Sequence, residues 1–187
     1  LEALLTHLKN ERAFDFTGYK RASLARRIQR RMQDIDIQDD EHYLDYLHVH
    51  PDEFIPLFNT ILINVTAFFR DADTWDYINS SVLPAILALK GDDGQVRVWS
   101  AGCASGEEAY TLALLLAEAL GLDAFRQRAK IYATDVDEDA LARARLALFS
   151  AKQLEPVPEQ LRTRYFLQTG ADEYTLHNDL RRAVIFG

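Results

Sequence analysis

The residues best placed for chemistry follow a short apolar segment, Val96–Ala101. They form the loop Ala101-Gly-Cys-Ala-Ser-Gly106, and the acidic pair Glu107 and Glu108 comes directly after it. Glycines let a backbone turn sharply and approach a ligand without a Cβ in the way. A helix that begins after such a loop presents unpaired N–H groups. By itself, the loop is as typical of a simple strand-to-helix turn as of a binding site.

The acidic pair and the glycine spacing narrow the kind of ligand. Acids in a first helical turn interact favourably with the helix dipole, so one of the two is expected to be structural. A carboxylate that faced the ligand would repel phosphate and attract a cation. The glycines are spaced GxxxG and do not form the GxGxxG fingerprint of dinucleotide-binding loops. The loop therefore favours S-adenosylmethionine, which carries an ammonium and a sulfonium, over NAD.

A second candidate is Asp135, which follows the apolar segment Lys130–Thr134. A carboxylate that follows the carboxyl end of a strand in an open α/β sheet can accept hydrogen bonds from ribose hydroxyls. The alternative is that Asp135 or Asp137 caps the next helix. Asp137 is better placed as the cap, which would leave Asp135 for a ligand, and the sequence keeps both interpretations open.

Composition limits the other function classes. The chain has 187 residues, enough for one large domain or two small ones, and its net charge of −8 does not favour a nucleic-acid partner. Cys103 is the single cysteine and the five histidines are scattered, so neither a disulfide nor a metal site is expected. The first residues do not resemble a signal peptide, and no apolar run is long enough for membrane insertion. We expect a cytoplasmic protein.

One segment departs from the acidic balance of the chain. Between Lys20 and Gln33 there is no acid, and Leu24, Ile28 and Met32 recur at every fourth residue, which predicts a helix with one apolar stripe. A basic helix in an acidic protein suggests an anionic partner, whereas the alternative is a solvated charged face. Its cations are Lys20, Arg21, Arg26, Arg27, Arg30 and Arg31.

The pattern of elements changes near residue 90. Residues 1–90 are predicted to be helical, including helices over 40–50 and 72–89, and 91–94 is a turn-rich linker. Residues 91–187 follow the order strand, loop, helix, strand, helix, which is typical of a parallel α/β sheet. The expected strands are 96–101, 130–134 and 183–186, and the expected helices are 107–120 and 137–148. Since such sheets usually have five or more strands, we expect this domain to be incomplete.

Three segments together carry a family resemblance. They are Asn64-Val-Thr-Ala-Phe-Phe-Arg-Asp71, Val98-Trp-Ser-Ala-Gly-Cys-Ala-Ser-Gly-Glu-Glu-Ala-Tyr110 and Ala133-Thr-Asp-Val-Asp137. In this order and spacing the chain resembles the CheR family of chemotaxis-receptor methyltransferases over essentially its whole length. The resemblance implies a helical domain followed by a Rossmann-like domain that binds S-adenosylmethionine. It also implies methylation of glutamate carboxylates on the cytoplasmic helices of chemoreceptors, with S-adenosylhomocysteine as product.

The resemblance also assigns roles to single residues. It implies that Glu107 binds the methionine end of the cofactor, Asp135 its ribose, and that Arg70 is catalytic beside the transferred methyl. The full set of implied cofactor-binding residues is Asn64, Thr66, Arg70, Gly102, Glu107 and Asp135. The implied substrate-binding residues are Arg26, Arg27, Arg30 and Arg31 of the basic helix. Phe68 and Phe69 are expected in the core.

The chain departs from the family pattern in three places. Ala104-Ser105 replaces the usual Ser-Thr, and Ala109 replaces a frequent Pro. The family continues beyond a strand like 183–186 into segments that complete the cofactor pocket, so we expect a truncated catalytic domain. The β-subdomain that can tether receptor tails would fall near 165–182, where this chain is short, which does not favour tethering. The domain also resembles versions embedded in longer hybrid signalling proteins.

Three alternatives remain open from the sequence. One is a non-catalytic domain that binds S-adenosylmethionine as a sensor or scaffold in a hybrid signalling protein. Another is a nucleotide-binding oxidoreductase, which the GxxxG spacing and the paired acids disfavour. The last is an interaction module that works only through the basic helix. For the enzyme, a glutamate carboxylate with a reference pKa of about 4.3 is already ionised at neutral pH, so no general base is required.

Overall fold

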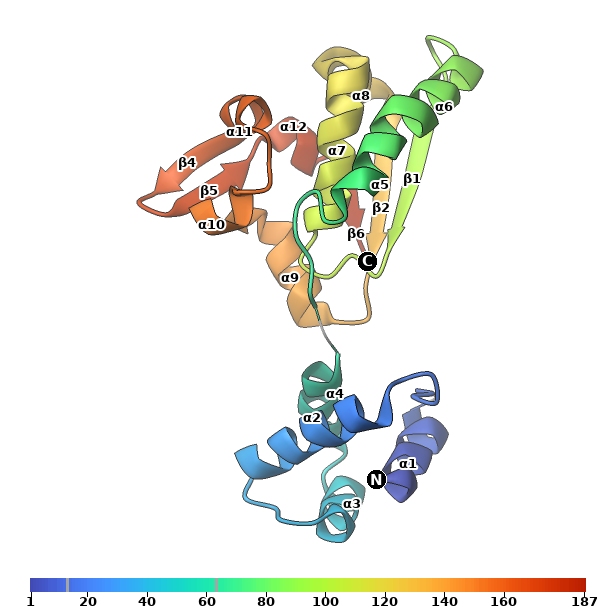
Figure 1. The fold of residues 1–187 in the computed structure, drawn as a ribbon, viewed down its shortest axis with the longest axis vertical. Coiled ribbons are helices and arrows are strands. Elements are labelled where there is room, and N and C mark those ends of the chain that lie inside the picture. The colour runs from blue at the N-terminus through green and yellow to red at the C-terminus, as the bar shows by residue number, and fades with distance from the viewer. Residues whose placement is uncertain (13, 63) are drawn as a thin grey trace. The chain divides into compact units, whose positions relative to one another are not determined.

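The computed structural model describes residues 1–12, 14–62 and 64–187. The chain forms two compact units, Leu1–Ile63 and Asn64–Gly187, coloured blue to teal and green to red in Figure 1. The sequence pattern placed the change of architecture near residue 90, later than this division. The boundary lies earlier than predicted because Phe68, Trp75 and Leu83 are buried in the core of the second unit, so the segment that carries them belongs to that unit.

The first unit is all helical. It consists of α1 (Glu2–Arg12), α2 (Arg21–Asp34), α3 (Asp40–Val49), the 3-10 turn η1 (Pro51–Glu53) and α4 (Phe54–Ile61). As predicted, Leu24, Ile28 and Met32 form the buried stripe of α2. They share one apolar core with Tyr43 of α3 and with residues of α1 and α4. Burial of this stripe orients the arginines of α2 away from the core centre.

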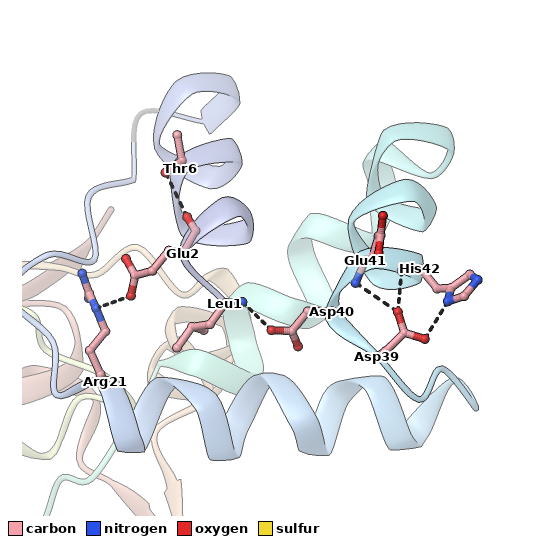
Figure 2. Close-up of polar contacts among 8 residues, drawn as sticks. All are labelled: Leu1, Glu2, Thr6, Arg21, Asp39, Asp40, Glu41 and His42. Carbon is pink, nitrogen blue, oxygen red and sulfur yellow. Dashed lines mark hydrogen bonds and ion pairs between the residues drawn. The ribbon is translucent and has the colours of Figure 1, made fainter.

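Polar contacts at the ends of α1, α2 and α3 lie on the surface of this unit. Figure 2 shows them among Leu1, Glu2, Thr6, Arg21, Asp39, Asp40, Glu41 and His42. Asp39 caps α3 by accepting from the backbone N–H groups of its second and third residues. The same carboxylate lies 2.6 Å from Nδ1 of His42 and raises the pKa of that imidazole. Since exposed pairs contribute less than about 1 kcal/mol each, these surface contacts add little to the stability that the apolar core provides.

The second unit contains a parallel sheet of three strands, β1 (Val96–Ala101), β2 (Ala129–Thr134) and β6 (Val184–Phe186), in the order β1-β2-β6. Between β1 and β2 lie α7 (Glu107–Leu120) and α8 (Leu122–Arg128), and α9 (Glu138–Leu146) follows β2. The α/β fold class and all three predicted strands are confirmed. Because the strands are parallel, the residues after β1 and β2 meet at one edge of the sheet.

The two faces of this sheet differ. One face buries Val96, Ile131 and Ala133 in the core that includes the apolar face of α7. On the other face Trp99 pairs in register with Tyr132, which pairs with Ile185, and these side chains are 70%, 42% and 46% exposed. Within the described residues, this row forms an exposed apolar surface, although parallel sheets usually have both faces covered.

The helix predicted over residues 72–89 is a continuous helical run of three parts, α5 (Ala72–Tyr77), the π-turn η2 (Ile78–Val82) and α6 (Leu83–Lys90). Pro84 lies in the first turn of α6. Proline lacks an N–H and its ring clashes with a regular helical carbonyl, so a π-turn directly before it accommodates the residue. The prediction of a helix despite Pro84 is confirmed, with the π-turn as the local adjustment.

A small antiparallel sheet lies between α9 and β6 in sequence, in orange-red in Figure 1. Its strands are β3 (Leu148–Phe149), β5 (Glu173–Leu176) and β4 (Phe166–Gly170), in that order, and α10 (Ala151–Leu154), α11 (Glu159–Tyr165) and α12 (Asn178–Arg181) accompany them. Phe68 joins this sheet to the core, with ring centroids 4.9 Å from Phe149 and 5.7 Å from Phe166. Only the resemblance placed strands here, because elements of two to five residues leave little periodicity to detect.

Candidate functional site

The loop between β1 and α7 contains two glycines with different roles. The backbone N–H groups of Gly102 and Cys103 both donate to the carbonyl of Thr134, at 2.8 and 3.0 Å, and tie the loop to the end of β2. Gly102 has φ of 74°, and a Cβ there would meet nothing within 4 Å. A Cβ on Gly106 would instead lie 3.0 Å from Ala144. Gly102 therefore leaves open space beside the loop, whereas Gly106 permits close packing.

Asp135 stabilises this loop from the neighbouring strand. Its Oδ2 accepts from the backbone N–H of Ala104 at 2.7 Å, and its Oδ1 accepts from that of Asp137 at 2.9 Å. Asp137 is the cap of α9, as predicted, and accepts from the N–H of Ala140 at 2.9 Å. The sequence suggested that Asp135 would be left for a ligand, but its carboxylate already accepts these two backbone hydrogen bonds. An ionised carboxylate accepts about four hydrogen bonds, so Asp135 can accept further hydrogen bonds.

Glu107 is a buried acid at the start of α7, with 3% of its surface exposed. Its Oε2 accepts from the hydroxyl of Ser105 at 2.8 Å, and its Oε1 accepts from the side-chain amide of Gln153 at 3.4 Å. Both donors are neutral, and no ion pair reaches Glu107 from any residue that the structure describes. A buried carboxylate without a cation is costly, so this arrangement suits a ligand that brings a positive charge.

The two acids after the loop have different surroundings. Glu108 is exposed and accepts from the hydroxyl of Ser100 at 2.7 Å, so it braces the end of β1. Gln153, which donates to Glu107, was not predicted as a site residue. It belongs to a capping box with Ser150 at the start of α10. The Ser-x-x-Gln spacing signals that box in the sequence, but no sequence signal brings α10 to Glu107.

The segment 64–71 contributes Asn64, Thr66 and Arg70. The side-chain amide of Asn64 donates to Oδ2 of Asp137, which places Asn64 beside the turn that holds Asp135. Thr66 is half-buried in the same segment. Arg70 is exposed, and its Nη1 donates to the carbonyl of Val65 at 2.8 Å. The structure thus brings Asn64 to the strand ends and leaves the guanidinium of Arg70 at the surface.

The single cysteine has no nucleophilic character. Burial raises the pKa of the Cys103 thiol to about 11, and the nearby charge of Asp135 acts in the same direction. The thiol is therefore protonated at neutral pH, and protonated thiols are poor nucleophiles. Among the described residues, no group of three histidine, cysteine or acidic side chains is arranged to hold a metal ion.

The four arginines predicted to bind substrate divide into two pairs. Arg31 forms a bidentate ion pair with Glu53, at 2.7 and 2.8 Å, and Arg27 donates to the carbonyl of Ile61 at the end of α4. These two side chains stabilise the helical unit. Arg26 and Arg30 are exposed, and no ion pair engages either of them within the described ranges.

The geometry of the loop, the two acids and the strand ends agrees with the comparison with known families. The family described as "CheR methyltransferase, SAM binding domain" matches residues 64–187, and "CheR methyltransferase, all-alpha domain" matches residues 1–62. The chain belongs to the CheR methyltransferase family. The two family matches meet where the chain divides into its two compact units.

Individual proteins resemble this chain over most of its length. This chain is 34% identical over 172 residues to an uncharacterized 104.1 kDa protein of Rhodobacter capsulatus, and the alignment covers 92% of this chain and 18% of that protein. It is 34% identical over 182 residues to the chemotaxis protein methyltransferase of Listeria innocua, covering 96% and 66%. The corresponding Escherichia coli protein is 32% identical over 158 residues, covering 83% and 52%. The chain thus spans half to two thirds of the length of these two named methyltransferases. None of its described helices has the length and apolarity needed to cross a membrane.

Proposed function

We propose that this chain binds S-adenosylmethionine and takes part in methylating glutamate carboxylates on the cytoplasmic helices of chemoreceptors. The observation that carries the proposal is the buried Glu107 carboxylate with only neutral donors around it. Two relatives of similar sequence are named chemotaxis protein methyltransferases, which supports the reaction class. Since the proposed substrate lies on the cytoplasmic side of the membrane, we expect the chain to act in the cytoplasm.

The residues of the site fit this cofactor in three respects. Glu107 offers a negative charge for the ammonium of the methionine end, and Asp135 offers acceptors for the ribose hydroxyls. Gly102 leaves the space beside the loop open, so backbone can approach the ligand. Asn64, Thr66 and Arg70, from the segment before α5, complete the proposed contacts with the cofactor. A phosphate-bearing dinucleotide would suffer repulsion from the buried Glu107, which disfavours the oxidoreductase alternative.

In the proposed reaction, bound S-adenosylmethionine supplies a methyl group on a sulfonium, which a receptor glutamate accepts as a methyl ester. The protein needs no base, because the accepting carboxylate is ionised at neutral pH. Its contribution is to position the reactants and to exclude water. Arg70, whose guanidinium is exposed and charged, is proposed to orient the incoming carboxylate. Replacing Arg70 with Ala and finding full turnover would remove it from this role.

The basic helix α2 is the proposed receptor-binding surface. Of its four candidate arginines, Arg26 and Arg30 are the side chains we assign to receptor contact, since Arg27 and Arg31 have partners inside the unit. Replacing Arg26 and Arg30 with Glu should weaken receptor binding and leave cofactor binding unchanged. Equal receptor binding by this variant would exclude α2 as the contact surface.

Calorimetry with S-adenosylhomocysteine tests the cofactor site, with Glu107→Gln and Asp135→Asn as matched variants that keep shape and remove charge. We expect the parent to bind and both variants to bind at least about tenfold more weakly, since a charged hydrogen bond contributes about 1.5–3 kcal/mol. Transfer of a tritiated methyl group to receptor then separates an enzyme from a non-catalytic binding domain. Binding without transfer would favour the sensor or scaffold alternative.

A further inference from the structure

The segment that contains Arg70 has an unusual backbone. Phe69 and Asp71, on either side of Arg70, have φ of 51° and 59°, in the left-handed region that non-glycine residues rarely adopt. Such conformations cost energy and persist only where the surrounding structure holds them. A segment of this kind needs identifiable anchors.

Two anchors hold this segment. The ring of Phe68 is fully buried among the aromatic side chains of the small sheet. The backbone N–H of Phe69 donates to the hydroxyl of Thr111 at 3.3 Å, and that hydroxyl donates to the carbonyl of Glu107 at 2.8 Å. Thr111 is fully buried, one turn after Glu107 in α7. Its hydroxyl therefore links the Arg70 segment to the first turn of α7.

We propose that Thr111 is a positioning residue, which acts on the cofactor site through Arg70. It holds Phe69 in its left-handed conformation, and this conformation sets the direction of the Arg70 backbone. The inference rests on the proposed function, because it concerns the same cofactor site. A purely structural Thr111 would fill space in the core, and valine, which has the same shape, would then replace it without effect on binding.

The test is a titration of S-adenosylhomocysteine into the parent chain, Thr111→Val, Thr111→Ser, Arg70→Ala and the Thr111→Val/Arg70→Ala double variant. We expect Thr111→Val to bind about tenfold more weakly, the fold-change that corresponds to about 1.4 kcal/mol. Thr111→Ser keeps the hydroxyl and should bind within about twofold of the parent. Since Arg70 is also a proposed cofactor contact, Arg70→Ala should bind at least as weakly as Thr111→Val. The double variant should bind like Arg70→Ala alone, because residues that act through one another are not additive.

Each other outcome overturns the inference in a recognisable way. Equal binding by the parent and Thr111→Val makes Thr111 structural, and additive losses in the double variant show that it does not act through Arg70. Absence of binding by the parent overturns the proposed cofactor site itself, which is a separate result. Amide hydrogen exchange keeps the inference testable even if Thr111→Val does not fold. If the Phe69 N–H of the parent exchanges at the rate of an unstructured peptide, Thr111 does not hold it.

Discussion

Two buried glutamates, one in each unit, have opposite surroundings. Glu53 in the helical unit is 5% exposed, and Glu107 in the α/β unit is 3% exposed. Glu53 accepts two hydrogen bonds from Arg31 and one from the hydroxyl of Tyr43 at 2.9 Å. Glu107 accepts only from Ser105 and Gln153, which are neutral.

The difference separates a structural charge from a binding charge. The Arg31–Glu53 pair and the Tyr43 hydroxyl satisfy one another. The hydrogen bond to Glu53 raises the pKa of Arg31, whereas burial, followed by the hydrogen bond to Glu53, raises the pKa of Tyr43. Nothing remains there for a ligand to neutralise. The Glu107 carboxylate is held in place without being neutralised. Burial alone therefore does not identify a functional acid. Glu107 is a candidate because it is buried without a cationic partner and follows the loop between β1 and α7.

Replacing Arg31 with Ala should have the largest effect on stability. It leaves Glu53 buried and unpaired, which destabilises a protein by about 3–5 kcal/mol. Urea unfolding followed by circular dichroism measures the change. Arg30→Ala is the matched control, because Arg30 directly precedes Arg31 in α2 but is exposed, and it should change stability by less than about 0.5 kcal/mol. Equal effects of the two would mean that the Glu53 pair is not structural.

Replacing Glu107 with Gln should weaken binding of S-adenosylhomocysteine by about 10- to 100-fold, the loss expected for a charged hydrogen bond. Stability without ligand should change little, because relief from burying a charge is offset by loss of its favourable interaction with the α7 dipole. Calorimetry and thermal unfolding measure the two quantities. A clear loss of stability would place Glu107 in the same class as Glu53.

Replacing Asp137 with Ala should cost about 1 kcal/mol through loss of the α9 cap. It also removes the acceptor for Asn64, so affinity for S-adenosylhomocysteine should fall with stability. Asp137→Asn keeps an oxygen for the cap and should lose less stability. If the Ala and Asn variants are equally stable, the cap does not contribute.

The last effect concerns Cys103 and appears only at high pH. Its thiol has a pKa of about 11 in the folded chain and a reference value of 9.0. A raised pKa contributes stability that is present below pH 9 and is lost as pH rises from 9 to 11. At pH 10 the loss from this group is about 1.4 kcal/mol. Cys103→Ala should therefore lose less stability than the parent between pH 8 and pH 10 in parallel urea titrations, and identical losses would contradict the prediction.

Local patterns of the sequence predicted most of the elements around the site. The four-residue spacing of Leu24, Ile28 and Met32 predicts α2, and the strand, loop and helix order predicts the parallel sheet. Asp137 is recognisable as a cap because a capping residue acts on neighbours three positions away. These features depend on short-range geometry, which a sequence contains directly. The roles of single residues in cofactor and receptor binding stay predictions.

Contacts between distant segments were decided only by the tertiary structure. No local rule could predict that Gln153 donates to Glu107 or that Asp135 accepts from the N–H of Ala104. Nor could it predict that Arg31 forms an ion pair with Glu53 whereas Arg30 does not. The same limit explains why residues 64–90 were assigned to the helical domain, although their apolar side chains complete the α/β core. Residue type and spacing determined which groups could do chemistry. Packing decided which of them are already neutralised, because that depends on what folding places beside each charge.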